Sequence, residues 1–245
     1  KSIGALGLDR PRSPKGKLMI QNLFSMTGKV CLITGGSSGL GSYMAAGFLA
    51  AGAERVFITG RSEDKLSKKA DELSALSEGQ CIGISGDLSD LEGVQALADA
   101  ISQRESHLDV LVNNAGLGLG TQIETMTAKA WDKSMSLNTR SPLFLTQALL
   151  ELLKAKATLD DPSRVIFISS VAASAVLPSV LAYSTSKKAL EHLTPSLALA
   201  LTDDFIRVNA IAPGRFYSEM TRGAWEDPQA ESFLAELERI PAHRY

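Results

Sequence analysis

Cysteine, histidine and aromatic residues are all scarce in this chain. Its 245 residues include two cysteines, Cys31 and Cys81, and three histidines, and 6% are aromatic. Two cysteines inside apolar segments cannot build a disulfide framework or a zinc site with paired cysteine ligands, so no metal is expected. We therefore predict a cytoplasmic, reducing environment. An organellar protein whose targeting segment has been removed stays open as an alternative, because the first residue is lysine.

The chain also lacks an excess of charge of either sign and any long apolar run. It carries 27 acidic residues against 25 lysines and arginines, a formal net charge of −2. This balance gives no electrostatic reason to bind nucleic acid or an anionic membrane, so neither is expected as a partner. No apolar run approaches the roughly 18 residues of a membrane helix. A hydrophobic content of 44% is sufficient for a globular core.

Residues 1–22 differ in composition from the rest of the chain. They hold five basic residues and one acidic residue, together with Gly and Pro, and show no apolar period. This composition predicts a basic, flexible N-terminal arm. No stretch rich in Pro, Gly or Ser divides the remainder, so residues 23–245 are expected to form a single domain.

From residue 29 onward, short β-branched apolar runs alternate with longer amphipathic stretches. The runs expected as strands are 29–34, 55–59, 81–85, 109–113, 164–169 and 206–211. Helical periods fill 41–51, 63–77, 91–104, 128–156 and 183–201. Strands that are apolar on both faces and alternate with helices predict an α/β fold with a doubly wound parallel sheet, the Rossmann fold.

The first predicted strand is followed by a glycine-rich loop, TGGSSGLG, at residues 34–41. A glycine turn before a helix presents free backbone N–H groups and the positive end of the helix dipole to a pyrophosphate. Gly35 would permit the turn, Gly39 the close approach of phosphate, and Gly41 the packing of helix on strand. The loop residues expected to bind a dinucleotide are Gly35, Ser37, Ser38, Gly39, Leu40 and Gly41.

The same loop also fits a different chemistry. Gly35, Ser37 and Gly39 match G-x-S-x-G, the nucleophile elbow of serine hydrolases, so a hydrolase with Ser37 as nucleophile is an alternative function. Such an enzyme needs a histidine downstream, and His243 near the C-terminus would have to serve. A dinucleotide-binding module without turnover is a third hypothesis.

The residue after the second predicted strand selects the dinucleotide. An NAD site places Asp or Glu about 20 residues after the glycines, whereas Thr59, Gly60 and Arg61 stand at that point here. The guanidinium of Arg61 offers forked donors and a permanent charge to a 2′-phosphate, which favours NADP(H). The alternative for Arg61 is a solvated side chain before a helix capped by Ser62.

Tyr183 and Lys187 form a Y-x-x-x-K pair at the start of a predicted helix. The spacing i, i+4 places both on one face of the helix, one turn apart. A tyrosine that exchanges protons near neutral pH needs its pKa lowered by about three units, or ~4 kcal/mol. A lysine ammonium some 4 Å away in a partly shielded site supplies an attraction of about that size.

Several motifs occur in the same order as in a known family: the chain resembles the short-chain dehydrogenase/reductase family, in its compact branch. After TGGSSGLG come GDL at 86–88, NNAG at 113–116, ISS at 168–170, YSTSK at 183–187 and APG at 212–214. The resemblance runs from about residue 23 to residue 241. Within the family, APGRFYSEMTR makes the chain most similar to β-ketoacyl-acyl-carrier-protein reductases of the rhamnolipid-synthesis type.

This resemblance implies an NADP(H)-dependent oxidoreductase that interconverts a ketone, such as a 3-oxoacyl compound, and a secondary alcohol. It implies that Ser170 binds the substrate oxygen, that Tyr183 transfers the proton and that Lys187 holds the nicotinamide ribose. A homodimer or homotetramer acting on a small molecule is expected. The further cofactor contacts that it implies come from Asp87, Leu88, Asn113, Asn114, Ala115, Gly116, Pro213, Gly214 and Ser218.

In the family, a residue matched by Asn138 holds a relay water on its backbone carbonyl. Pro142 follows four residues later, and proline has no N–H to give that carbonyl. We therefore predict a kinked or bulged helix at 138–142, with a water on the Asn138 carbonyl near Lys187. The alternative is a helix that begins after Ser141, with Pro142 at its first position.

The end of the sequence departs from the family pattern. Ile240, Pro241 and Arg244 match the opening of a segment that relatives continue into a helix and a seventh strand. Six strands are therefore expected, with the seventh missing. No motif specifies the substrate or the physiological direction of the reaction.

Overall fold

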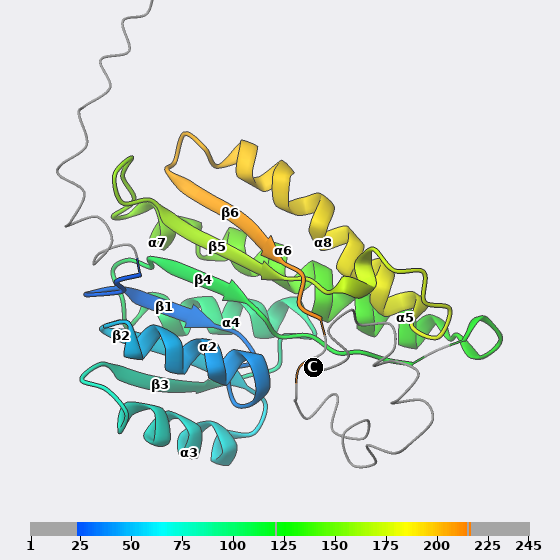
Figure 1. Cartoon of the computed structure of the whole chain (residues 1–245), viewed down its shortest axis with the longest axis horizontal. Coiled ribbons are helices and arrows are strands. Elements are labelled where there is room, and N and C mark those ends of the chain that lie inside the picture. Colours follow the sequence, from blue (N-terminus) through cyan, green and yellow to red (C-terminus); the bar gives the residue numbers. More distant parts are fainter. Residues whose placement is uncertain (1–23, 121, 215, 217–245) are drawn as a thin grey trace, which may run out of the picture.

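The computed structural model describes residues 24–120, 122–214 and 216. Six parallel strands form one sheet in the order β3-β2-β1-β4-β5-β6 (Figure 1). They are β1 Val30–Ile33, β2 Arg55–Gly60, β3 Gln80–Ser85, β4 Val110–Asn113, β5 Ser163–Ile168 and β6 Ile206–Ile211. Each overlaps one of the six predicted strands, so the doubly wound parallel sheet is confirmed. The predicted arm at 1–22 lies outside the described residues.

The sheet grows outward from β1 in both directions. From β1 the chain moves to β2 and β3, then crosses back so that β4 pairs with the other edge of β1. In a sheet of this kind, ligands bind beyond the carboxyl ends of the strands at the point where the order reverses. The loops after β1 and β4 therefore lie where a dinucleotide is expected.

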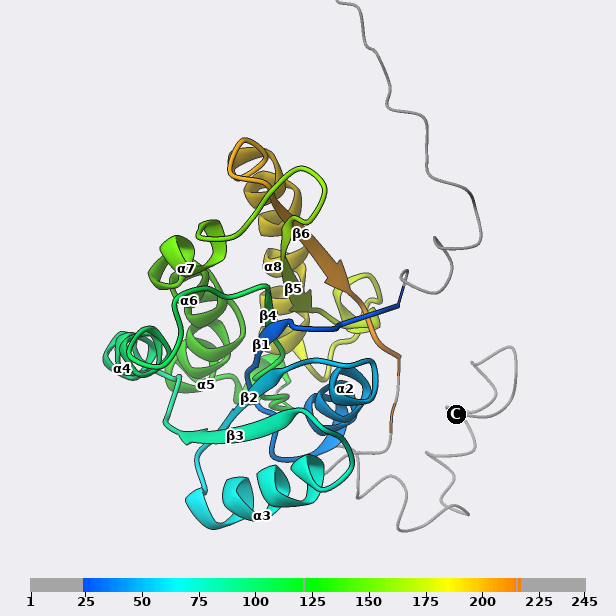
Figure 2. The ribbon, with the colours of Figure 1, turned by 90° about the vertical axis from the view of Figure 1, so that its left-hand side faces the viewer.

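Helices cover both faces of the sheet, as Figure 2 shows. One hydrophobic core lies under α2 Gly39–Ala50 and α3 Glu63–Ser74, and another under α4 Leu91–Ser102, α6 Ser141–Ala148 and α8 Leu181–Ala200. Alternate side chains of β1 enter the two cores: Leu32 enters one, and Cys31 and Ile33 enter the other. This two-sided burial explains why the strands are continuous apolar runs.

Both cysteines are buried in the core beneath α2 and α3. The structure gives Cys31 and Cys81 as free thiols with almost no exposed surface. Burial raises the pKa of the Cys31 thiol, and it raises that of Cys81 to about 11. Both side chains therefore act as small apolar core residues.

The predicted helix at 128–156 is divided into four pieces. They are α5 Ala128–Met135, the π turn η2 Ser136–Arg140, α6, and α7 Leu150–Lys154. The backbone stays right-handed helical through Met135, Arg140 and Ser141, and the Ser141 N–H bonds to the Ser136 carbonyl five residues back. The predicted bulge is confirmed, although it spans 136–140 rather than 138–142. The helical backbone continues through it into α6, whose first turn contains Pro142, so the alternative of a separate helix that begins there is wrong. A proline without an N–H is accommodated by widening one turn.

Two short 3₁₀ helices lie in the loops after β4 and β5: η1 Ile123–Thr125 and η3 Val171–Ala173. Among the described residues, no helix combines the length and the hydropathy that a membrane crossing requires.

Candidate active site

The glycine loop follows β1 at the carboxyl edge of the sheet. Gly35 (φ 68°) and Gly39 (φ 55°) both have backbone angles that other residues rarely adopt. A Cβ on Gly41 would lie 2.3 Å from the Gly35 carbonyl oxygen. The turn at Gly35 is therefore confirmed, whereas the predicted packing of Gly41 on the strand is wrong: Gly41 packs closely on the loop instead.

The N-terminus of α2 has the properties of an anion site. Ser38 is its N-cap residue, and its side chain makes no capping hydrogen bond. The N–H groups of the first turn, which includes Leu40, thus have no side-chain acceptor from the cap residue, and they lie at the positive end of the helix dipole. An uncapped helix start behind a glycine turn fits a pyrophosphate group.

The predicted 2′-phosphate contact lies beside this loop. Ser37 faces the end of β2, because a Cβ on Gly60 would be 3.0 Å from Ser37 Oγ. Arg61 is the next residue and is exposed. Ser62 accepts the Lys65 N–H as the cap of α3, so Arg61 lies just outside that helix. The capped helix of the alternative interpretation is therefore present, and the exposed Arg61 side chain lies beside it, where a 2′-phosphate contact stays a prediction.

The NNAG segment is bound directly to the glycine loop. Asn114 Nδ2 donates to the carbonyl oxygens of Thr34 (2.8 Å) and Gly35 (3.1 Å). Thr34 Oγ1 accepts the N–H groups of Asn114 (3.0 Å) and Ala115 (2.9 Å). Sequence reasoning gave no role to Thr34, although it is the first residue of the TGxxxGxG motif. Asn114 thus holds the two loops together.

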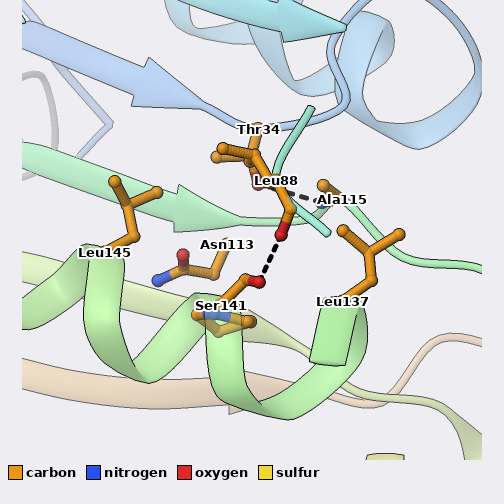
Figure 3. A pocket seen from close by; sticks show the side chains of 8 residues that line it. Thr34, Leu88, Asn113, Ala115, Leu137, Ser141 and Leu145 are labelled. Atoms are coloured by element: carbon orange, nitrogen blue, oxygen red, sulfur yellow. Dashed lines mark hydrogen bonds between the residues drawn. The ribbon is translucent and has the colours of Figure 1, made fainter. Parts of the chain in front are cut away.

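Asn113 points away from the loop and toward α6, as Figure 3 shows. It is buried, and its Nδ2 donates to Thr146 Oγ1 at 3.3 Å. A cavity of about 10 Å³ lies between Asn113, Leu88 and α6. This is about the space of one water molecule, so it cannot hold a substrate or a dinucleotide.

Lys187 is buried at the base of the candidate site. Only 4% of the Lys187 surface is exposed, and its Nζ donates to the Ile168 carbonyl oxygen at 2.7 Å. Loss of hydration lowers the pKa of Lys187 to about 8. Its Nζ lies 5.9 Å from the centre of the half-buried Tyr183 ring. The structure therefore brings the two predicted side chains together on one face of α8.

Ser170 begins the turn that follows β5. Its Oγ accepts the Ala172 N–H at 3.2 Å, which caps η3, and η3 packs against α8. The next residue, Val171, donates its N–H to the Pro213 carbonyl at 3.1 Å. Ser170, the half-buried Pro213 and the exposed Gly214 thus share the carboxyl edge of the sheet. Ser218, the remaining predicted cofactor contact, lies outside the described residues.

Asn138 is fully buried within η2. Its Oδ1 accepts the Leu117 N–H, and its Nδ2 donates to the Leu117 carbonyl and to Ser186 Oγ, each at 2.9 Å. The Cβ position of Gly116 lies 3.1 Å from Asn138 Oδ1 and 3.3 Å from Lys187 Nζ, so both side chains converge there. The sequence predicted a role for the carbonyl of Asn138, and the structure adds one for its side chain. Ser186 was missed, although it lies inside the YSTSK motif.

Asp87 and Leu88 follow β3 on the other side of the glycine loop. Asp87 is exposed, and its Oδ1 accepts the Ser89 N–H at 3.0 Å. Leu88 is buried, and its carbonyl accepts the hydroxyl of Ser141 from α6 (Figure 3). The exposed Asp87 carboxylate thus lies on a loop whose backbone is held by the hydrogen bond from Ser141.

The described part of the chain does not supply the histidine that a hydrolase with Ser37 as nucleophile requires. His107 precedes β4, at the opposite end of the sheet, with its Nε2 3.3 Å from Asp109 Oδ2. His192 is exposed on α8, and His243 lies outside the described residues. The described residues also contain no group of three or more His, Cys, Asp and Glu side chains placed to hold a metal ion.

Comparisons with known proteins agree with this geometry. A family model described as short chain dehydrogenase matches residues 29–229. A rhamnolipids biosynthesis 3-oxoacyl-[acyl-carrier-protein] reductase of Pseudomonas aeruginosa is 44% identical over 223 residues, which are 91% of this chain and 85% of that protein. A 2-dehydro-3-deoxy-D-gluconate 5-dehydrogenase of Escherichia coli is 32% identical, over 93% of this chain and 86% of that protein.

Solved structures give the same result. The Pseudomonas aeruginosa RhlG/NADP active-site complex superposes with a TM-score of 0.86 at 43% identity, covering 91% of this chain and 85% of that one. The L-sorbose reductase of Gluconobacter frateurii, complexed with NADPH and L-sorbose, reaches a TM-score of 0.82 at 27% identity, covering 91% and 86%. With its glycine loop, its NNAG segment and its buried lysine beside a tyrosine, this Rossmann-fold chain belongs to the short chain dehydrogenase family of oxidoreductases.

Proposed function

We propose that this chain interconverts a ketone and a secondary alcohol with NADP(H), and that its ketone is of the 3-oxoacyl class. The observation that carries the reaction is the buried Lys187 one helical turn from Tyr183, at the sheet edge where the uncapped α2 begins. The Pseudomonas aeruginosa relative, a 3-oxoacyl-[acyl-carrier-protein] reductase by name, supports the substrate class.

The residues present fit the cofactor. Gly35 and Gly39 form the turn, and the free N–H groups at the start of α2 would hold the pyrophosphate. Arg61 would pair with the 2′-phosphate, and Asp87 would contact the adenine edge. The RhlG complex with NADP supports this choice of dinucleotide. When bound, the nicotinamide supplies the hydride, and the protein supplies position and charge.

The proton is handled by the chain's own side chains. Lys187 has a pKa of about 8 and is therefore charged near pH 7, where its ammonium places a positive charge 5.9 Å from the centre of the Tyr183 ring. Tyr183 gives its proton to the substrate oxygen during reduction and takes it back during oxidation. Ser170 holds that oxygen by a hydrogen bond. Asn138 fixes Leu117 and Ser186. A water held by its backbone carbonyl would return a proton to Tyr183 after the reduction.

Replacement of Tyr183 by Phe tests this function. The variant keeps the ring and loses the proton, so NADPH-dependent reduction of a 3-oxoacyl thioester should fall by about 10²- to 10⁴-fold. The dissociation constant for NADPH, followed by its fluorescence, should stay unchanged. Tyr43→Phe removes an exposed hydroxyl from α2 and is the matched control. A wild type that only binds NADPH would favour the module without turnover, and ester hydrolysis abolished by Ser37→Ala would favour the hydrolase.

We further propose a cytoplasmic homo-oligomer in which residues 23–245 are one catalytic domain and residues 1–22 an arm. Two buried free thiols suit a reducing compartment. Trp131 on α5 and Phe144 on α6 are partly exposed aromatic side chains on neighbouring helices, and such side chains are typical of subunit contacts.

A further inference from the structure

Two side chains at the end of the π turn bind the loop that follows β3. Ser141 Oγ donates to the Leu88 carbonyl oxygen, as Figure 3 shows. The guanidinium of Arg140 donates to the Ser89 carbonyl oxygen at 3.0 Å. The proposed reaction uses neither contact. Both contacts hold the backbone immediately after Asp87, the residue proposed to meet the adenine.

The hydroxyl of Ser141 has a choice of two acceptors. It lies 2.8 Å from the Ser136 carbonyl oxygen as well as within hydrogen-bond distance of the Leu88 carbonyl. A hydroxyl carries one proton and can donate to one of them. The Ser136 carbonyl already accepts the backbone N–H of Ser141. Among the described residues, no other group donates a hydrogen bond to the Leu88 carbonyl oxygen, so the Ser141 hydroxyl proton is assigned to it.

Burial makes this hydrogen bond important for the position of the loop. Ser141 and Leu88 are both buried, and the cavity of about 10 Å³ beside them has room for at most one water molecule, which would lack the fixed position of the Ser141 hydroxyl. A buried carbonyl without a donor is unfavourable, and the backbone that carries it moves until it finds one. Such a movement would displace Asp87, which directly precedes Leu88.

We infer that Ser141 is a positioning residue for the adenine half of the cofactor. It holds the Asp87–Ser89 loop on the π turn, and Arg140 supports the same loop from the surface. This inference rests on the proposed NADP(H) site. It adds that η2 and the first residue of α6 together serve both halves of that site, because Asn138 within η2 holds Leu117 and Ser186 on the nicotinamide side.

The test replaces Ser141 by Ala and uses Ser134→Ala as the matched control. Ser134 is also a buried serine of this helical segment, but its Oγ has no hydrogen-bond partner among the described residues. Both variants lose the same atom. Dissociation constants are measured for NADPH, for adenosine 2′,5′-bisphosphate and for reduced nicotinamide mononucleotide, which lacks the adenosine.

Ser141→Ala should weaken NADPH and the bisphosphate by about tenfold. It should change the mononucleotide constant, and kcat at saturating NADPH, by less than about twofold. Ser134→Ala should leave all four values unchanged. A general loss of structure would instead weaken the ligands of both halves alike, and this result, or an unchanged bisphosphate constant, would overturn the inference.

A further variant and the behaviour of wild type distinguish failure of this inference from failure of the proposed reaction. If Ser141→Ala does not fold, Arg140→Met removes the exposed donor to Ser89 and must weaken the bisphosphate in the same direction. If wild type binds NADPH and reduces no 3-oxoacyl thioester, the proposed reaction fails while the binding comparison still stands. If wild type binds neither NADPH nor the bisphosphate, both proposals fall.

Discussion

At the scale of single residues, Lys187 combines a charge with a site that water hardly reaches. Burial lowers its pKa from 10.5 to about 8. Between these two values the unfolded chain binds a proton that the folded chain has released. The unfolding free energy therefore rises with pH across this window, because the cost of burying the ammonium disappears as it deprotonates.

Replacement of Lys187 by Met should reveal this cost. Wild type should gain about 3 kcal/mol relative to the variant between pH 7 and pH 10.5, at ~1.4 kcal/mol per pKa unit. Urea unfolding of both proteins at pH 7, 9 and 10.5 measures the difference. Lys188→Met, at the neighbouring exposed lysine, should show no such trend. A difference between wild type and Lys187→Met that does not vary with pH would contradict this account.

Residues of the site differ in how far the sequence could reveal them. Tyr183 and Lys187 meet through one helical turn, so their spacing alone predicted the contact. The other positioning residues are harder to predict, because their partners lie far away in the sequence or because such side chains are common on protein surfaces. They are Thr34, Ser141 and Ser186. The link from Ser141 to Leu88 crosses 53 positions, and no local pattern marks it. The described residues therefore include positioning groups that only the fold reveals.

At the scale of elements, the π turn η2 depends on Pro142. Replacing Pro142 by Ala restores an N–H that the Asn138 carbonyl can accept, and the turn can then close to an ordinary α-helix. Asn138 would shift relative to Leu117 and Ser186. We expect kcat to fall by about 10- to 100-fold, because small displacements of positioning groups have large effects.

Thermal unfolding should accompany these rates. The melting temperature of Pro142→Ala should stay equal to that of wild type or rise, since a regular helix gains a hydrogen bond. Lower stability together with full activity would show that the bulge has another cause.

The glycine loop makes a prediction with a control inside the same helix. A Cβ on Gly41 would lie 2.3 Å from the Gly35 carbonyl, whereas a Cβ on Gly47 meets nothing within 4 Å. Gly41→Ala should abolish NADPH binding or prevent folding. Gly47→Ala should retain binding and raise the unfolding free energy by about 0.5 to 1 kcal/mol. Titration with NADPH and urea unfolding check both, and equal behaviour of the two variants would refute the packing argument.

Most elements could be predicted from the sequence, and the exceptions have a physical cause. The strand at 206–211 was predicted with its observed bounds, because its apolar run ends at turn residues. The segment 128–156 was predicted as one helix, since its apolar period does not break where the backbone widens. Only the missing N–H of Pro142 marked the bulge, and periodicity does not record it.

At the scale of the whole molecule, chemistry and ion pairing occupy opposite ends of the sheet. The candidate site lies at the carboxyl edge, whereas Lys29, Asp109 and Asp161 form ion pairs at the other. The hydrogen bond from Lys29 holds the pKa of Asp161 below its usual 3.8. Burial opposes the charge on Lys29, but its hydrogen bonds to both carboxylates outweigh this and raise its pKa.

This separation predicts acid sensitivity that is independent of the reaction. A lowered carboxyl pKa stabilises the fold above pH 3.8, and this contribution is lost as pH falls below that value. Asp161→Asn should lower the unfolding free energy at pH 7 by up to about 1 kcal/mol, since the pair is half exposed. The difference from wild type should shrink progressively as the pH falls below 3.8, with kcat unchanged at pH 7.

Asp160→Asn is the control, because its carboxylate is exposed one residue earlier. If Asp160→Asn and Asp161→Asn lower stability equally at pH 7, the ion pair with Lys29 contributes nothing.

The two core thiols have a practical consequence. Reagents such as maleimides react with exposed thiolates, and neither Cys31 nor Cys81 presents one in the native protein. Val176, 94% exposed beyond η3, could be exchanged for a cysteine that would carry the sole fluorophore without removal of the native pair. Single-molecule spectroscopy could then follow ligand binding to a protein whose core, including both native cysteines, is unchanged.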